Sequence, residues 1–184
     1  SLEAVSMLED FEVNAYKVAS FEITYTQLLK EIGKTKKPVI LSTGMSTFSE
    51  ISEAITTLYE AGTKDLALLK CTTSYPATFD QLNLNLIDQM IEDFNVPVGF
   101  SDHTLEIHTG ALAVTRGATI LEKHVKMDED KDSLDAEFAL PISQVKNYIK
   151  YSNDAWLAKG KKIYGPVGEE KNYLKYRRSI IVGR

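Results

Sequence analysis

One theme repeats along this chain: a short apolar run ends in small or polar residues and is followed by a segment of helix length. This alternation is typical of βα units, in which each strand pairs in parallel with the next. Five such strands are predicted, over residues 16–20, 38–42, 66–70, 96–100 and 119–123. The sequence therefore predicts an α/β fold built on a parallel sheet.

The segment between the second and third predicted strands has the clearest helical pattern. Ile51 and Leu58 lie two helical turns apart, on one face of residues 49–60. Ser49 is expected to be the N-cap, because its hydroxyl can accept a hydrogen bond from the first turn. Gly62 is expected to end the helix.

Polar residues follow every predicted strand. In parallel α/β folds, the carboxyl ends of the strands carry the functional site. A doubly wound sheet would concentrate its chemistry at one crevice, whereas here all five strand ends carry polar side chains. This distribution favours a (β/α)8 TIM barrel, and five strands form only part of such a barrel because closure needs eight.

Composition narrows the classes of partner. Hydrophobic residues make up 43% and charged residues 26%, which is typical of a globular domain. The net charge of -5 argues against nucleic acid as a partner, and no apolar run reaches the roughly 20 residues that cross a membrane. The first residues are acidic where a secretory signal needs bases, and Cys71 is the single cysteine. We therefore expect a cytoplasmic location, no internal disulfide and a buried thiol.

The last third of the chain differs from the rest. Residues 126–132 are expected to form a charged loop and residues 141–156 a helix. A Gly- and Lys-rich stretch follows, and a basic segment ends in the strand-like residues 179–182. We divide the chain into a partial barrel, residues 1–160, and a linker, residues 161–184.

Five short motifs fall at the five strand ends. In order, they are Lys17-Val-Ala-Ser-Phe-Glu22, Ser42-Thr-Gly-Met45, Cys71-Thr-Thr-Ser-Tyr-Pro76, Ser101-Asp-His-Thr104 and Glu122-Lys-His124. Together they resemble the motifs of the N-acetylneuraminate (sialic acid) synthase family, including its pseudaminic and legionaminic acid synthase branches. The resemblance runs from about Asn14 to Arg184 and includes the segment from Asp135 to Leu140.

The resemblance implies that this chain holds about the last five βα units of the family's catalytic barrel. The family's first three strands and its small antifreeze-like (SAF) C-terminal domain are expected to be missing, and Arg177 and Arg178 resemble the hinge to that domain. Two positions depart from the family pattern, because Val125 replaces a frequent Phe and Thr73 replaces an Asn of some members. Both departures concern substrate contacts rather than the class of reaction.

His103 and His124 end neighbouring predicted strands, so their imidazoles are expected to converge at one rim. Two imidazoles without thiolates can hold one divalent cation, and Mn²⁺ or Mg²⁺ would complete its octahedron with substrate oxygens and water. The resemblance implies the same role for this pair. His108 is instead expected to be a hydrogen-bonded core residue inside the next helix.

The implied reaction joins phosphoenolpyruvate to an N-acetylated amino sugar, either N-acetylmannosamine or a diacetamido-hexose. The metal would polarise the sugar aldehyde, and the products would be a nonulosonic acid and phosphate. The family also implies a homo-oligomer of the dimer type.

The expected roles of the site residues follow from the resemblance and from their places at the strand ends. Glu22 is expected to steer the attacking water or its proton. Lys17 is expected to pair with phosphoenolpyruvate, and these two are the predicted catalytic residues. The predicted substrate-binding groups are the hydroxyls of Ser20, Ser42, Thr73 and Tyr75 and the carboxylate of Asp135.

Successive residues of a strand point to opposite faces of the sheet, which bears on the neighbours of the two histidines. Lys123 is expected to face the outer helices, and Asp102 and Glu122 either to face them too or to orient the histidines. Two rival interpretations stay open. One is a Schiff-base aldolase with Lys17 or Lys123 as the amine nucleophile, and the other is a non-catalytic fragment that binds a partner.

Overall fold

The computed structural model describes residues 1–177, and one parallel sheet forms its centre. Strands that are neighbours in the sheet are also neighbours in the sequence, and each pairs in parallel with the next. They are β1 (Tyr16–Val18), β2 (Val39–Ser42), β3 (Leu66–Cys71), β4 (Val98–Asp102) and β5 (Leu121–Lys123). This order without reversal is that of a barrel wall. It confirms the predicted α/β partial barrel.

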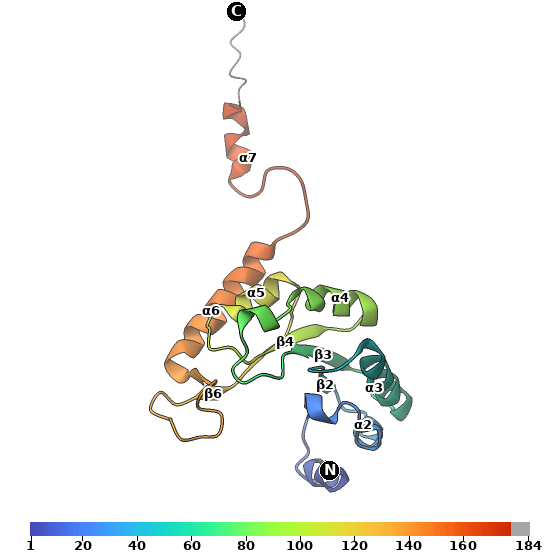
Figure 1. The fold of residues 1–184 in the computed structure, drawn as a ribbon. Helices are drawn as coiled ribbons and strands as arrows, with labels where there is room; N and C mark the ends of the chain where they lie inside the picture. Colours follow the sequence, from blue (N-terminus) through green and yellow to red (C-terminus); the bar gives the residue numbers. More distant parts are fainter. Residues whose placement is uncertain (178–184) are drawn as a thin grey trace, which may run out of the picture.

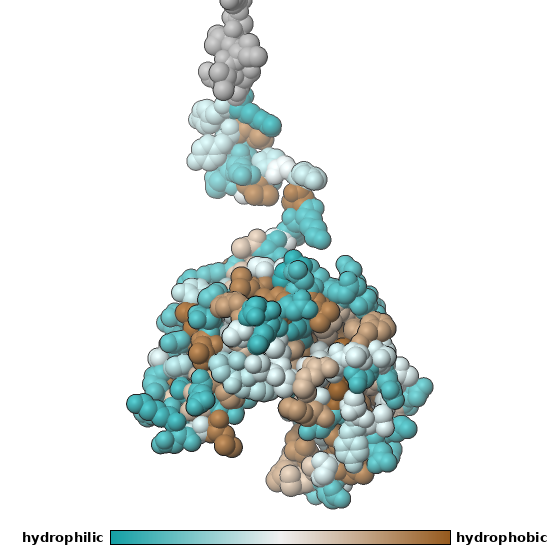
Figure 2. Space-filling model, viewed as in Figure 1, coloured by the Kyte–Doolittle hydropathy of each residue, from teal (hydrophilic) through white to brown (hydrophobic). Residues whose placement is uncertain are grey.

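Helices cover the outer side of the curved sheet (Figure 1), and the molecule is hollowed on the inner side (Figure 2). The α-helices are α1 (Leu2–Asp10), α2 (Thr26–Lys34), α3 (Phe48–Ala61), α4 (Asn85–Phe94), α5 (Thr109–Thr115), α6 (Ile142–Lys159) and α7 (Glu170–Tyr173). Short 3-10 helices are η1 (Ser20–Glu22), η2 (Phe79–Gln81) and η3 (Leu174–Tyr176). A second, small parallel sheet pairs β6 (Val125–Lys126) with β7 (Leu140–Pro141).

The hydrophobic core lies between the sheet and its helices. The central strands β2 and β3 are nearly continuous apolar runs, as buried parallel strands usually are. Leu41, Leu68 and Phe100 from the sheet are fully buried, as are Leu29 and Leu58 from α2 and α3. Each such side chain stabilises the fold by roughly 1.5–3 kcal/mol relative to an exposed one. The core therefore fixes the wall that holds the strand ends.

The start of α3 differs from the prediction. Thr47, and not Ser49, is the N-cap: its hydroxyl accepts a hydrogen bond from the Glu50 N–H, and the Glu50 carboxylate accepts one from the Thr47 N–H at 2.7 Å. Several hydroxyl residues precede this helix, but only Thr47 has a glutamate three positions later, which a capping box requires. Gly62 ends the helix as predicted, with φ of 126°.

Three strands begin later than predicted. β2 and β4 start directly after Pro38 and Pro97, because proline has no N–H to donate to the ladder. β5 begins at Leu121, inside its predicted range. β4 extends to Asp102, so that His103 follows the strand directly.

The chain beyond β5 follows the prediction in outline. The first residue of the predicted loop 126–132 belongs to β6, and the helix predicted over 141–156 is α6. After α6 the chain extends away from the barrel (Figure 1), and we keep residues from 161 onward as a proposed linker. The predicted strand 179–182 lies outside the described residues. Within residues 1–177, no helix combines the length and the apolar character needed to cross a membrane.

Candidate active site at the carboxyl ends of the strands

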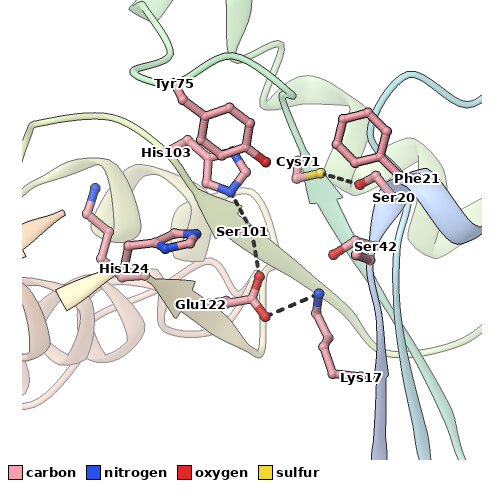
Figure 3. A pocket seen from close by; sticks show the side chains of 12 residues that line it. Lys17, Ser20, Phe21, Ser42, Cys71, Tyr75, Ser101, His103, Glu122 and His124 are labelled. Carbon is pink, nitrogen blue, oxygen red and sulfur yellow. Dashed lines mark hydrogen bonds and ion pairs between the residues drawn. The ribbon is translucent and has the colours of Figure 1, made fainter. Parts of the chain in front are cut away.

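A cavity of about 420 Å³ lies at the carboxyl ends of the five strands (Figure 3). Every strand contributes to its wall, as expected for the mouth of a barrel. Six of the predicted site residues line the cavity: Lys17, Ser20, Ser42, Tyr75, His103 and His124. Residues that the prediction did not assign to the site also line it, among them Phe21, Cys71, Ser101 and Glu122.

The two predicted metal ligands lie next to each other in the wall of this cavity. The ring centroids of His103 and His124 are 5.5 Å apart. Nδ1 of His103 lies 2.8 Å from the carbonyl oxygen of Thr72, and Nδ1 of His124 lies 3.0 Å from Oδ2 of Asp135. A carbonyl oxygen can only accept, so His103 carries its proton on Nδ1. Such partners hold an imidazole in place and leave Nε2 to face a metal; Nε2 of His103 also lies 3.2 Å from the Ser101 hydroxyl, a contact that a bound metal would replace.

An aromatic wall fixes the orientation of both imidazoles. The Tyr75 ring packs against His103 with centroids 4.3 Å apart, and Phe138 packs against His124 at 5.0 Å. Tyr75 and Phe138 also contact each other at 4.9 Å. Burial lowers the pKa of His103 below its ordinary value of 6.5 and raises the pKa of the Tyr75 phenol above 10.0. His103 is therefore held neutral, the form that binds a metal.

The two histidines fit a metal ion that takes only some of its ligands from the protein. Among residues 1–177, no group of three or more His, Cys, Asp or Glu side chains converges as a complete metal site. His103 and His124 supply two nitrogens, and both have the Nδ1 partner that a ligating histidine usually has. A divalent cation here would take its other ligands from substrate oxygens and water.

An ion pair also lines the cavity. Nζ of Lys17 lies 3.3 Å from Oε2 of Glu122, and the Ser101 hydroxyl donates to Oε1 of Glu122 at 2.7 Å (Figure 3). The Lys17 and Glu122 side chains are 36% and 38% exposed, so both remain accessible to a ligand. Of the two alternatives given for Glu122, facing the outer helices is wrong. Orienting the histidines agrees with its bond from Ser101, whose hydroxyl also lies 3.2 Å from Nε2 of His103.

Strand alternation contains the signal that identifies Ser101 and Glu122. Each lies two residues before a cavity-facing histidine, His103 or His124, and so on the same face of its strand. The two are also direct partners in the ladder between β4 and β5. Glu122 was grouped with Asp102 in the sequence analysis, and both were expected either to face the outer helices or to orient the histidines.

Small hydroxyl-bearing residues surround a tight turn after β2. The Ser20 hydroxyl accepts a hydrogen bond from the Gly44 N–H at 2.9 Å and lies 3.0 Å from the Cys71 sulfur. A Cβ on Gly44 would lie 2.4 Å from Oγ1 of Thr73, 2.7 Å from Sγ of Cys71 and 2.8 Å from Oγ of Ser20. Oγ1 of Thr73 is buried without a hydrogen-bond partner among the described residues. These groups form a compact set of donors beside Lys17.

Three predicted site residues do not line the cavity. Thr73 lies behind Gly44, and the exposed Asp135 reaches the cavity only through its bond to His124. Glu22, in η1, lines a separate cavity between β1 and α1 that also includes Val5. The structure thus brings Lys17 to the two histidines and leaves the Glu22 carboxylate to one side.

Two further basic side chains, Lys123 and His108, have their partners outside the reaction space, although Lys123 also borders the cavity. Nζ of Lys123 lies 3.1 Å from Oδ1 of Asp102 and beside the Tyr148 ring on the helix side of the sheet, as expected. The prediction for His108 is wrong: it precedes α5 as the N-cap residue, is exposed, and stacks on Phe79 with centroids 5.5 Å apart. The helix begins one residue later than the prediction required.

Comparison with known proteins identifies the family. The model of the NeuB family matches residues 1–164. The chain belongs to the NeuB family. Among its relatives, an uncharacterized protein of Methanocaldococcus jannaschii is 38% identical over 100% of this chain and 55% of its own length. The N,N'-diacetyllegionaminic acid synthase of Campylobacter jejuni is 40% identical over 79% of this chain and 44% of its own length.

A solved structure supports the same assignment. The N-acetylneuraminic acid (sialic acid) synthetase of Leptospira borgpetersenii, in complex with citrate, superposes with a TM-score of 0.89 and 28% sequence identity. The match covers 98% of this NeuB-family chain and 63% of the other. The chain therefore spans about half the length of the curated relatives it matches.

Proposed function

We propose that the protein containing this chain is a sialic-acid-type synthase, which condenses phosphoenolpyruvate with N-acetylmannosamine or a diacetamido-hexose. One observation carries the proposal: two imidazoles with engaged Nδ1 atoms line one cavity together with the Lys17–Glu122 ion pair. A cytoplasmic location and a homo-oligomer belong to the same proposal and rest on the sequence and the family alone.

Phosphoenolpyruvate would bind on the β1–β3 side of the cavity. Lys17 supplies a positive charge there, and hydroxyls of Ser20 and Ser42 line the same wall. Thr73 adds a buried hydroxyl that lacks a partner among the described residues. Charge-assisted hydrogen bonds of this kind suit phosphate and carboxylate oxygens. When phosphoenolpyruvate binds, its anionic groups would take over part of the contact that Lys17 makes to Glu122. The Glu122 carboxylate would keep its hydrogen bond from Ser101.

The amino sugar would bind on the β4–β5 side. His103 and His124 would hold the Mn²⁺ or Mg²⁺ ion through Nε2, and when bound the ion supplies Lewis-acid polarisation of the sugar aldehyde. Asp135 keeps His124 oriented and is exposed enough to accept hydrogen bonds from sugar hydroxyls. The Tyr75 ring closes this end and limits the access of water.

The reaction balances without an oxidant or reductant. C3 of phosphoenolpyruvate forms a bond to the aldehyde carbon, and the aldehyde oxygen becomes a hydroxyl by taking one of the two protons of the water that adds at C2. The other proton leaves with the phosphate. Water adds to C2, and the bond between C2 and the phosphate oxygen breaks, which leaves a ketone and free phosphate. Glu22 is proposed to take the proton of that water, supported by its place in η1 directly after the cavity-lining Ser20. Its side chain would need another rotamer for this step.

The contacts of Lys123 argue against this residue as the nucleophile of the Schiff-base alternative, which leaves Lys17 to be tested. Its amine is 6% exposed and bound to Asp102 and the Thr104 carbonyl, and an imine requires a free, accessible nucleophile. Borohydride treatment with pyruvate or with the sugar separates the two chemistries. The synthase should remain unlabelled by mass spectrometry and should form a nonulosonic acid only when phosphoenolpyruvate and sugar are both present. A borohydride-stable adduct on Lys17 or Lys123 would refute the synthase.

A further inference from the structure

A second cluster of charged residues lies directly behind the two histidines, on the helix side of the sheet. Asp102 precedes His103 and Lys123 precedes His124, and the two are partners in the ladder between β4 and β5. Their side chains are 0% and 6% exposed, with Nζ of Lys123 3.1 Å from Oδ1 of Asp102. A buried cross-strand ion pair therefore joins the residues that carry both imidazoles.

Additional hydrogen bonds make Asp102 the centre of a network. Oδ1 accepts from the Thr104 N–H at 2.9 Å and from the Thr104 hydroxyl at 2.8 Å. Oδ2 accepts from the Thr109 hydroxyl at 2.5 Å and from the Tyr148 hydroxyl at 3.1 Å. Lys123 in turn donates to the Thr104 carbonyl. The network thus joins β4, β5, the first residue of α5 and the middle of α6.

The network holds the backbone on both sides of His103. The residue before it is Asp102 itself, and the residue after it, Thr104, has its N–H bound to Asp102 and its carbonyl bound to Lys123. His124 is linked to the same ion pair because it directly follows Lys123 in the chain. A buried ion pair contributes little net stability, but it fixes one arrangement because breaking it leaves an unpaired buried charge.

We propose that Asp102 and Lys123 are positioning residues that set the separation and direction of the His103 and His124 imidazoles. The proposal rests on the metal-binding role proposed for these histidines. Lys123 borders the cavity, but its Nζ is bound to Asp102 and to the Thr104 carbonyl. The proposal therefore gives neither residue a contact with the metal or the substrate. Partners outside the ligand shell commonly change metal affinity by about 10–100-fold when they are removed, and this pair acts on both ligands.

The first test uses the whole natural protein that contains this chain. Lys123→Met keeps the length of the side chain and removes the charge, and it should weaken Mn²⁺ binding by about 10–100-fold. Electron paramagnetic resonance of free Mn²⁺ gives the affinity, and circular dichroism reports whether the variant is folded. The matched control is Lys37→Met, which breaks an ion pair with Glu9 at the opposite end of the sheet and should leave Mn²⁺ affinity unchanged.

A second readout needs no metal. Side-chain ¹H–¹⁵N spectra of the metal-free protein should show changed signals for His103 and His124 in Lys123→Met and unchanged ones in Lys37→Met. If Lys123→Met does not fold, Tyr148→Phe carries the test, because it keeps the ring and removes one bond to Asp102. Tyr148→Phe should weaken Mn²⁺ binding less than Lys123→Met does, and it should shift the same His103 and His124 signals.

The outcomes separate the two proposals. A folded Lys123→Met or Tyr148→Phe protein with unchanged Mn²⁺ affinity and unchanged histidine signals overturns the positioning role. If His103→Ala binds Mn²⁺ as tightly as the unmodified protein, the metal-binding proposal fails instead. In that case the metal-free spectra alone decide whether Asp102 and Lys123 position the imidazoles.

Discussion

The side chains that line the cavity differ in how firmly protein partners hold them in the absence of a ligand. His103 and His124 each use Nδ1 for a protein partner, and Nε2 of His103 also lies 3.2 Å from the Ser101 hydroxyl. Lys17 and Glu122 bind each other but stay more than a third exposed. The histidines are therefore fixed before a ligand arrives, whereas the Lys17 amine can exchange one anionic partner for another.

This difference predicts the effect of replacing Lys17. Lys17→Met should raise KM for phosphoenolpyruvate about 10- to 100-fold, since a hydrogen bond to a charged group contributes about 1.5–3 kcal/mol. Lys34→Met is the control, because Lys34 pairs with Glu31 on the surface of α2. Steady-state kinetics with varied phosphoenolpyruvate checks the prediction. Equal KM values for the two variants would remove Lys17 from the phosphoenolpyruvate site.

The environment of His103 predicts a pH effect on stability. Its pKa in the folded protein lies below 6.5 because burial disfavours the charged ring. The unfolded chain therefore binds a proton first as the pH falls through 6.5, and the free energy of unfolding decreases until the folded pKa is passed. Urea denaturation across this range should show a smaller decrease in His103→Asn than in the unmodified protein. An NMR titration of His103 with a pKa above 6.5 would contradict this account.

Many of the residues that line the cavity could be predicted from their positions at the ends of the strands. Six assigned residues line the cavity because every strand of a parallel sheet delivers its carboxyl end to one rim. For Glu122 two orientations were expected from the sequence, and strand alternation decides between them because Glu122 lies two residues before His124 and so on the same face. The Thr72 carbonyl and the Glu22 rotamer depend on loop conformation, which no pattern in the sequence specifies.

For individual helices and strands, the sequence predicted the type of element more accurately than the residues at which it begins and ends. The five strands follow from apolar runs, but Pro38 and Pro97 shift two of the starts because they cannot join the ladder. The N-cap of α3 was missed because three hydroxyl residues, Ser46, Thr47 and Ser49, lie close together. The glutamate at the third helical position decides between them.

The capping of α3 gives a direct test at this scale. Thr47→Ala should lower the free energy of unfolding by about 1 kcal/mol, because the Glu50 N–H loses its acceptor. Ser49→Ala should change it less, since Ser49 contacts only the Thr47 hydroxyl among these groups, at 3.2 Å. Urea denaturation of the two variants side by side measures the difference. A larger loss in Ser49→Ala would restore the original prediction for the cap.

At the scale of the whole molecule, the described part of the chain is an open wall rather than a closed barrel. β1 and β5 each pair with one neighbour in the sheet. A cavity of about 440 Å³ beside β5 is lined by apolar residues of α5 and α6, including Val114, Ile149 and the half-exposed Trp156. Open strand edges and exposed apolar surfaces favour pairing with other segments.

The 184-residue chain produced alone is therefore expected to self-associate and to lack turnover. Light scattering coupled to gel filtration should show a mass that increases with concentration. Assays of the same samples should show no condensation, because catalysis by positioning needs every contact in place. A monodisperse monomer that turns over as fast as the whole natural protein would show that the site is complete within these residues.

Phosphate release from phosphoenolpyruvate by the whole natural protein is the most direct test of a metal-dependent synthase with His103 and His124 at its centre. The account predicts release only with Mn²⁺ or Mg²⁺ and an N-acetylated amino sugar present. Release should be lost in His103→Ala and His124→Ala but kept in His108→Ala, whose ring stacks on Phe79 outside the cavity. Undiminished release after chelator treatment, or from either cavity variant, would contradict it.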